Sequence, residues 1–240
     1  MKIKAIRTQL FREGESLEKF IYEHIRQLRE RDIIAVTSKI AALGECRTAP
    51  ISEKEKIIKK ESEWAVPTKY AWLTMKDGML MPSAGIDESN ASGKLILLPK
   101  DSFTTAARLR AALLKHYGLK SLGVLLTDSR TLPLRAGAVG VALGYAGFNG
   151  IKDYRGVPDL FGRTLTMTRT NVADSLAASA VFLMGEGGER KPLAVIKDAP
   201  VTFRERVDRK EIIISINHDL YAPLLGKRKN TNIAKKKRIL

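Results

Sequence analysis

The order of the apolar segments is the feature that most constrains the fold of this chain. Short β-branched runs predict strands, and helical patterns stand between them at irregular intervals. A doubly wound sheet requires strands and helices that alternate along the chain, and in this sequence they do not alternate regularly. We therefore expect an α+β protein with mixed or antiparallel sheets and flanking helices. Strands are predicted at 1–7, 33–37, 94–98, 122–127, 193–196 and 212–216, helices at 17–28, 52–64, 101–117 and 171–184, and a hairpin at 70–81.

Local signals predict where several of these elements begin and end. Ser16 should cap the first helix, because a hydroxyl can accept a backbone N–H of the first turn. Asp101 or Ser102 should cap the third helix, and Gly118 should end it. The Gly- and Ala-rich stretch 133–150 predicts close backbone packing or a bend in a strand.

The bulk composition favours a folded cytoplasmic protein. The 240 residues suffice for one large or two small domains, and 44% of them are hydrophobic. The sequence contains no run of 18 or more apolar residues and no signal-like start, so no membrane association is expected. Its single cysteine, Cys46, fits a reducing compartment and is expected to be a buried spectator rather than a nucleophile.

The chain is strongly basic, with a formal net charge of +16. Seven of its Lys and Arg residues lie in the last fifteen positions, from Gly226, with no acidic residue among them. Such an excess attracts polyanions, which include nucleic acid, nucleoside triphosphates and acidic substrates. Aromatic residues are only 6% of the chain and do not interleave with basic ones, so charge alone does not choose among these partners.

Three acidic residues stand beside small or Gly-rich backbone, namely Asp87, Asp128 and Glu186. Together they could hold one or two Mg²⁺ or Mn²⁺ ions against the phosphates of a nucleotide. Each segment also has a structural interpretation when taken alone. The segment 85–90 can be an Asx-type turn, Asp128 can cap a strand, and 184–189 can be a helix C-cap. No G-x-x-x-x-G-K-[ST] or G-x-G-x-x-G pattern occurs.

Seven short motifs occur in an order and spacing that resemble the coenzyme F420-0:L-glutamate ligase family, the γ-glutamyl ligases of the deazaflavin pathway. The resemblance runs from about residue 5 to residue 200. The motifs are Val36–Lys39, Ala84–Asn90, Thr127–Ser129, Leu134–Gly137, Lys152–Arg163, Val172–Asp174 and Met184–Gly188.

The resemblance implies an α+β fold of unusual topology, an intertwined homodimer, and a ligase that joins L-glutamate to a carboxylate acceptor. It implies GTP as co-substrate and Mg²⁺ or Mn²⁺, with two ions expected, and an acyl phosphate intermediate. The implied metal ligands are Asp87, Asp128, Ser129 and Glu186, and the three acids among them are the implied catalytic residues. The implied GTP contacts are Thr8, Gln9, Leu10, Phe11, Ser38, Lys39, Asn90, Met184, Gly185, Gly187, Gly188, Glu189, Arg190 and Lys191.

Three positions depart from the family pattern. Leu43 stands where the family carries a GTP-contacting lysine. Arg7-Thr8-Gln9 replaces an N-terminal Gly-Leu-Pro, and Thr127–Leu132 replaces Thr-Asp-Thr-x-Gly-Arg. The carboxylates are retained, so these departures bear more on the substrate than on the reaction class.

Residues 1–204 are expected to form the ligase-like domain, which can contain two subdomains. Residues 205–240 are a divergent C-terminal segment with a basic tail from about 226. The acceptor could be F420-0-like or another carboxylate such as a folate, and GTP against ATP stays open. Two other hypotheses are a non-catalytic nucleic-acid-binding protein on the same scaffold, which uses the basic tail, and a structural dimer with a vestigial site.

Overall fold

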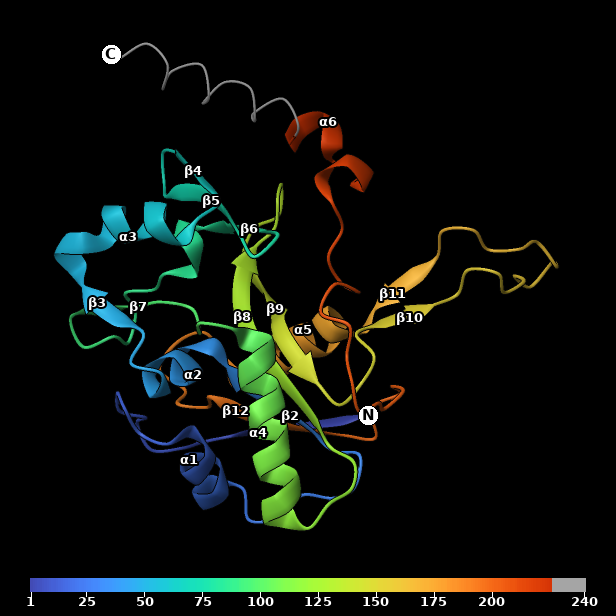
Figure 1. The fold of residues 1–240 in the computed structure, drawn as a ribbon, viewed down its shortest axis with the longest axis horizontal. Helices are drawn as coiled ribbons and strands as arrows, with labels where there is room; N and C mark the ends of the chain where they lie inside the picture. The colour runs from blue at the N-terminus through green and yellow to red at the C-terminus, as the bar shows by residue number, and fades with distance from the viewer. Residues whose placement is uncertain (226–240) are drawn as a thin grey trace.

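The computed structural model describes residues 1–225 (Figure 1). Its centre is a five-stranded sheet with the strand order β1-β12-β2-β8-β9. Only β2 and β8 run parallel, and the other neighbours in this sheet are antiparallel. The five strands are β1 (Lys2–Ile6), β12 (Leu193–Lys197), β2 (Ile33–Thr37), β8 (Gly123–Thr131) and β9 (Ala138–Ala146).

Helices cover both faces of the central sheet, with α4 in front of it and α5 behind it in Figure 1. Ile34 and Val36 of β2 point into the core beneath α1 and α4, whereas Ile33 and Ala35 point into the core beneath α5. This alternation explains why β2 is apolar throughout, since each of its faces meets a helix layer. The helices of these layers are α1 (Leu17–His24), α2 (Ser38–Gly44), α4 (Ser102–Tyr117) and α5 (Val172–Met184).

A β-bulge in the β8–β9 ladder changes which residues of β9 face each helix. Leu126 pairs with Gly144 and Thr127 pairs with Ala142, so Leu143 is the extra residue. A Cβ on Gly144 would lie 2.5 Å from the carbonyl carbon of Ser102 in α4, and one on Gly140 would lie 2.5 Å from the carbonyl oxygen of Ala177 in α5. The Gly- and Ala-rich segment therefore provides close packing, as the sequence predicted.

Residues 48–96 form a smaller layer beside the central sheet. Its hairpin turns at Asp77 and Gly78, which both have positive φ, as a two-residue turn of this kind requires. The elements are β3 (Thr48–Pro50), η1 (Ile51–Glu53), α3 (Lys54–Glu61), β4 (Trp64–Pro67), β5 (Trp72–Lys76), β6 (Met79–Pro82), η2 (Ser83–Gly85) and β7 (Lys94–Ile96).

Two further parts extend from the body. The segment between β10 (Ile151–Asp153) and β11 (Arg169–Asn171) forms a long arm that projects to the right in Figure 1. After β12 the chain returns over the sheet, and Val207 and Ile212 pack against the core beneath α5. It then passes through η3 (Ile216–His218) to α6 (Ala222–Leu225).

The structure confirms the α+β class and corrects several local predictions. The first helix ends at His24 rather than near Leu28, because the chain becomes extended at Ile25. The strand after Leu122 continues to Thr131, so Asp128 lies within it rather than at its end. Residues 212–216 form no strand, and Cys46 is exposed rather than buried. The basic tail from 226 lies outside the described residues. No helix within residues 1–225 is long and apolar enough to cross a membrane.

Asp101 caps α4, and its charge should add to the stability of the fold. Its carboxylate accepts hydrogen bonds from the Thr104 backbone N–H at 2.9 Å and from the Arg209 guanidinium at 2.7 Å. Partial burial disfavours the charged form, but these hydrogen bonds outweigh it and lower the pKa of Asp101 to about 2, from 3.8. The stabilisation is therefore complete above pH 4 and is lost as the pH falls towards 2.

We expect Asp101→Asn to keep the cap, because the amide oxygen still accepts from Thr104, but to lose the charge. The loss should be about 1 kcal/mol at pH 7, since the side chain is 43% exposed and solvent screens the pair with Arg209. The difference between the two proteins should shrink as the pH falls from 4 to 2. Urea unfolding at several pH values measures it, and a difference independent of pH would contradict this role for the charge.

Candidate functional site

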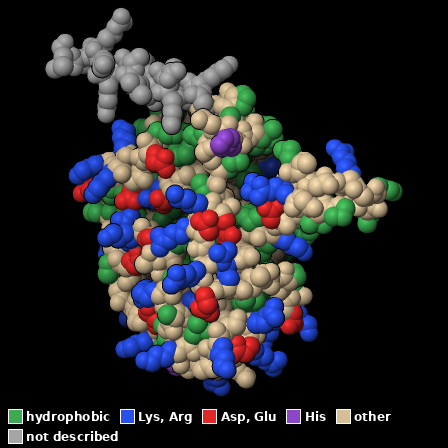
Figure 2. Space-filling view, turned by 45° about the vertical axis from the view of Figure 1, so that its right-hand side comes forward, with side chains coloured by type: hydrophobic (Ala, Val, Ile, Leu, Met, Phe, Trp, Pro, Cys, Tyr) green, Lys and Arg blue, Asp and Glu red, His purple; other side chains and the backbone are tan. Residues whose placement is uncertain are grey.

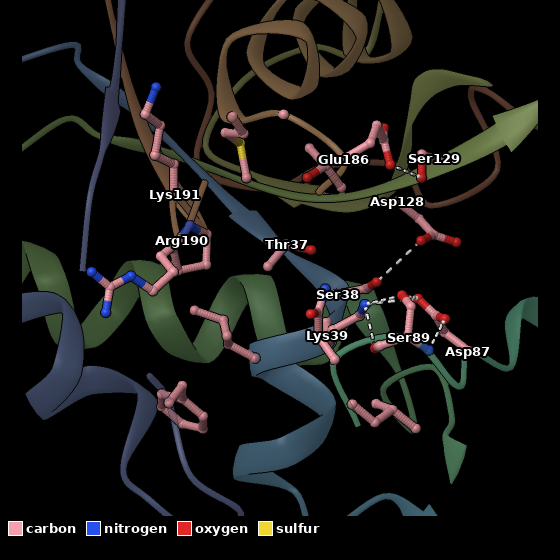
Figure 3. Close-up of a pocket in the computed structure, with 18 of the residues that line it drawn as sticks. Thr37, Ser38, Lys39, Asp87, Ser89, Asp128, Ser129, Glu186, Arg190 and Lys191 are labelled. Atoms are coloured by element: carbon pink, nitrogen blue, oxygen red, sulfur yellow. Dashed lines mark hydrogen bonds and ion pairs between the residues drawn. The ribbon is translucent and has the colours of Figure 1, made fainter. Parts of the chain in front are cut away.

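One cavity of about 250 Å³ gathers all the residues that the sequence predicted for nucleotide and metal binding. They come from five separate parts of the chain. These parts are the loop 8–11, the start of α2, the loop 85–90, the middle of β8 and the segment 184–191 that follows α5. Figure 3 shows Ser38, Lys39, Asp87, Ser89 and Asp128 close together, with Ser129 and Glu186 beside them and Arg190 and Lys191 on the other side.

The parallel pair β2–β8 builds the centre of the site. Thr37 pairs with Thr127, so the residues after them, Ser38 and Asp128, lie side by side. The Ser38 hydroxyl donates to Oδ1 of Asp128 at 3.3 Å. Two segments that are 90 residues apart in the sequence thus meet because both strands run in the same direction.

Asp128 is largely enclosed, with 23% of its side chain exposed. Burial raises the pKa of its carboxyl group, and the nearby charge of Asp87 adds to the effect. The Arg130 guanidinium, the Ser129 backbone N–H and the Ser38 hydroxyl act in the opposite direction. A cation bound beside Asp128 would relieve the unfavourable burial of its charge.

Lys39 holds the loop that carries Asp87. Its ammonium lies 2.7 Å from Oδ2 of Asp87 and donates to the carbonyl and hydroxyl oxygens of Ser89 at 2.9 and 3.0 Å. The Ser89 backbone N–H also donates to Oδ1 of Asp87, so the Asx-type turn exists as well. Burial opposes the charge of Asp87, but the bonds from Lys39 and Ser89 lower its pKa. The turn and the site are therefore compatible, because the turn presents Asp87 to the cavity.

Glu186 approaches β8 from the other side, at the end of α5. The Ser129 hydroxyl donates to Oε2 of Glu186 at 2.9 Å. Gly185 closes the helix, since its N–H donates to the carbonyl of Val181, and its φ of 83° turns the chain into the cavity. The helix C-cap considered from the sequence thus also exists, and it places Glu186.

The four proposed metal ligands do not form one cluster. Ser129 and Glu186 contact each other, whereas Asp128 contacts Ser38 and Asp87 contacts Lys39. Successive residues of a strand point to opposite faces, so Asp128 faces Ser38 whereas Ser129 faces Glu186. Within residues 1–225, no group of three or more His, Cys, Asp or Glu side chains lies close enough to hold a metal by itself. Mg²⁺ is commonly bound through one or two carboxylates plus water and substrate phosphates. The hard oxygen donors fit that kind of site and do not fit an all-protein cage.

The N-terminal loop forms another wall of the cavity. The Thr8 backbone N–H donates to the Arg190 carbonyl at 2.9 Å, which ties this loop to the segment after α5. Leu43 also lines the cavity. It presents an apolar side chain at the position where the family pattern has lysine. The lysine and arginine residues that line the cavity are Lys39, Arg190 and Lys191.

Sequence reasoning missed Arg130. It is only 5% exposed, and its Nη2 lies 4.0 Å from Oδ2 of Asp128. Its Nε and Nη2 have no hydrogen-bond partner among the described residues. Arg130 follows Asp128 by two residues in one strand, so both side chains are on the same face. That spacing would have identified it if the strand had been predicted to continue past Asp128.

Other cavity residues were not predicted as site residues, and most have small or apolar side chains. They would shape the space around a ligand rather than bind its charge. They are Thr37, Ile40, Leu43, Gly85, Ser89, Ile96, Leu97, Leu98, Thr127, Val181 and Pro192.

Known proteins resemble this chain along most of its length. A protein named coenzyme F420:L-glutamate ligase from Methanosarcina acetivorans is 32% identical over 235 residues, which cover 88% of this chain and 92% of the relative. The protein of that name from Archaeoglobus fulgidus is 32% identical over 209 residues, or 78% of this chain and 83% of the relative. One from Methanococcus maripaludis strain C6 is 40% identical over 146 residues, and there the match spans 58% of the relative's length. Residues 45–198 match the family described as F420-0:Gamma-glutamyl ligase. The chain therefore belongs to the F420-0:gamma-glutamyl ligase family.

Proposed function

We propose that this protein is a GTP- and divalent-metal-dependent γ-glutamyl ligase that joins L-glutamate to a carboxylate acceptor. The observation that supports it most is the single cavity in which Asp87, Asp128 and Glu186 lie with Lys39 and the Gly-rich segment after α5. Carboxylates suit hard metal ions, and the lysine and the backbone N–H groups suit phosphate oxygens. The names of the relatives agree with glutamate ligation.

The proposed reaction has two steps. The acceptor carboxylate attacks the γ-phosphorus of GTP, which gives an acyl phosphate and GDP. The amine of glutamate then attacks the acyl carbon, the bond to phosphate breaks, and an amide forms as the amine loses a proton. Bound Mg²⁺ or Mn²⁺, of which we expect two, would neutralise charge on the phosphate oxygens, with Asp87, Asp128, Ser129 and Glu186 as protein ligands.

Lys39 has a defined part in this proposal. Its ammonium now pairs with Asp87 and lies 3.0 Å from the Ser89 hydroxyl. A lysine on the first turn of α2 can move its charge to a phosphate oxygen if a metal ion takes its place beside Asp87. Arg190 and Lys191 lie on the opposite side of the cavity in Figure 3 and would hold the other phosphates.

The acceptor is proposed to be F420-0-like, because the relatives are named for coenzyme F420. A folate would need the same bond and is the alternative acceptor. Departures from the family pattern at Thr8, Gln9 and Leu43 all fall on this cavity and would alter the surroundings of its ligands.

Calorimetric titration tests the proposed nucleotide site directly. GTP and then ATP are titrated into the full-length protein with and without Mn²⁺. We expect binding that requires Mn²⁺ and favours GTP, followed by glutamate-dependent phosphate release once an acceptor is supplied. If neither nucleotide binds, the departures at Thr8, Gln9 and Leu43 have removed the site, and the ligase proposal fails.

A homodimer is also proposed, and the arm between β10 and β11 is the surface that supports it. Leu160 is 99% exposed and Phe161 94%, and Figure 2 shows apolar side chains along this projection. Large apolar side chains at the end of a projecting arm are stabilised when a second copy covers them. Phe161→Asp should therefore shift the protein from dimer to monomer in sedimentation equilibrium. Thr164→Asp, on the same arm, adds the same charge without removing an apolar group and should leave the dimer intact.

Nucleic-acid binding is the second candidate function, and the net charge of +16 favours it. The segment Lys227–Arg238 on which it rests lies outside the described residues. If the protein binds nucleic acid, its affinity for RNA or DNA should fall steeply as the salt concentration rises, and it should fall further when residues 226–240 are deleted. Unchanged GTP-dependent activity in that deletion would make such binding at most an accessory function.

A further inference from the structure

Arg130 is a buried cation beside the candidate site, and the proposed reaction gives it no task. Only 5% of the residue is exposed, and it does not itself line the cavity. Its Nη1 donates to the Leu80 carbonyl of β6 at 3.4 Å, whereas its Nε and Nη2 have no hydrogen-bond partner among the described residues. The family pattern Thr-Asp-Thr-x-Gly-Arg leaves position 130 open and has its arginine where Leu132 stands, so Arg130 is a feature of this chain.

The acidic group nearest to Arg130 is Asp128. Nη2 of Arg130 lies 4.0 Å from Oδ2 of Asp128, whereas the Ser38 hydroxyl donates to Oδ1. One carboxylate oxygen is therefore beside a hydroxyl of the cavity and the other is beside a fixed positive charge. Arginine stays charged at pH 7. The two side chains are only 6% and 23% exposed, so solvent screens the charge of Arg130 weakly.

The charges around the cavity balance one another once Arg130 is included. Lys39 already pairs with Asp87 at 2.7 Å, and Arg130 adds a positive charge beside Asp128. Within residues 1–225, the acidic side chains that line the cavity are Asp87, Asp128, Glu186 and Glu189, and the basic ones are Lys39, Arg190 and Lys191. With Arg130 the two signs are equal in number. A free divalent ion therefore finds oxygen donors here but no net negative charge to attract it.

A nucleoside triphosphate would supply the negative charge that the cavity lacks. Its phosphate oxygens are themselves ligands for Mg²⁺ and Mn²⁺, which proteins commonly bind through one or two carboxylates together with substrate phosphates. The complex of the ion with the nucleotide still carries a net negative charge, which Lys39, Arg190 and Lys191 would attract. The balanced charges thus favour this complex over the free ion.

We propose that Arg130 sets the order of binding, because its charge beside Asp128 keeps free divalent ions out and the ion enters as its complex with the nucleotide. This inference rests on the proposed ligase function, since that function gives Asp128 its part as a metal ligand. Arg130 acts through Asp128 and touches neither the nucleotide nor the acceptor.

Titration of MnCl₂ without nucleotide tests this role, with free Mn²⁺ measured by electron paramagnetic resonance. Full-length protein should bind Mn²⁺ weakly. Arg130→Met, which removes the charge, should bind it about tenfold more tightly or better. Arg130→Lys keeps a charge and should stay within about twofold of the original protein. Arg110→Met is the matched control and should change nothing, because Arg110 is also buried but bonds to Leu122 and Glu205, and none of the three lines the cavity.

Two further comparisons distinguish this role from a structural one. In the Asp128→Asn background, Arg130→Met should no longer tighten Mn²⁺ binding. With saturating GTP, the difference between the original protein and Arg130→Met should shrink, since the phosphates then supply negative charge. A structural role would change the free energy of unfolding in urea without tightening Mn²⁺ binding. If Arg130→Met does not fold, Arg130→Gln, which can still donate to Leu80, allows the same comparison.

The outcomes separate this inference from the ligase proposal. If GTP fails to bind in the presence of Mn²⁺ while Arg130→Met still binds free Mn²⁺ more tightly than the original protein, only the ligase proposal is rejected. Equal or weaker binding of Mn²⁺ by Arg130→Met would overturn the role of Arg130. Equal tightening by Arg130→Lys or Arg110→Met would also overturn it.

Discussion

Exchange of Asp128 for Asn should lower glutamate-dependent turnover by about 10³-fold or more, a loss of the size that follows removal of one group from a preorganised charged site. Asp128 lines the cavity, accepts a hydrogen bond from Ser38 and lies 4.0 Å from Arg130. Asparagine keeps the shape and the acceptor oxygen but loses the negative charge that a divalent ion needs. The proposed metal and nucleotide binding would fail together.

The same exchange should not destabilise the fold. Burial and the charge of Asp87 raise the pKa of Asp128, which means that the folded protein disfavours its charged form. A neutral amide at this position should give equal or greater stability at pH 7. Thermal unfolding and turnover are measured on the same preparation. Asp198→Asn is the control, because Asp198 is exposed with a φ of 53°, which asparagine tolerates. Unchanged turnover in Asp128→Asn would reject the metal-site assignment.

Local chemistry explains which parts of the fold could be predicted. Ser16 caps α1, Asp101 caps α4 and Gly118 ends α4 in a left-handed conformation, each as its residue type indicated. Segment 212–216 has the composition of a strand, but the chain there turns over the sheet and finds no strand to pair with. The composition of a segment shows only that it is apolar, whereas its pairing with another strand depends on residues far away in the sequence.

The site shows the same limit. The residues predicted for nucleotide and metal binding all line one cavity, whereas the motifs at 134–137, 152–163 and 172–174 contribute no residue to it. The motifs could not predict how the residues pair, because that depends on the register of β2 with β8. Nor could they predict that Asp128 and Ser129 face different partners, since the strand was expected to end before them. Arg130 was missed for this reason.

Gly140→Ala is the second change with a large expected effect, and it connects sheet packing to the site. A Cβ at this position would lie 2.5 Å from the Ala177 carbonyl oxygen and 2.7 Å from Cβ of Val181. Both atoms belong to α5, whose backbone can yield only if the helix moves away from β9. We expect a loss of about 3 kcal/mol in the free energy of unfolding, the upper part of the usual range for overpacking. The bulge at Leu143 causes this sensitivity, because it turns Gly140 towards α5.

A displaced α5 should also alter the cavity, because α5 ends at Met184 and leads directly into Gly185 and Glu186. The bond from Ser129 to Glu186, at 2.9 Å, joins this end of the helix to β8 and would be strained first. Urea unfolding measures the stability, and calorimetry measures metal-dependent nucleotide affinity below the unfolding range. Gly188→Ala is the stability control, since a Cβ there meets no atom within 4 Å. If Gly140→Ala and the original protein have equal free energies of unfolding, α5 packs on β9 less closely than the short distances at Gly140 require.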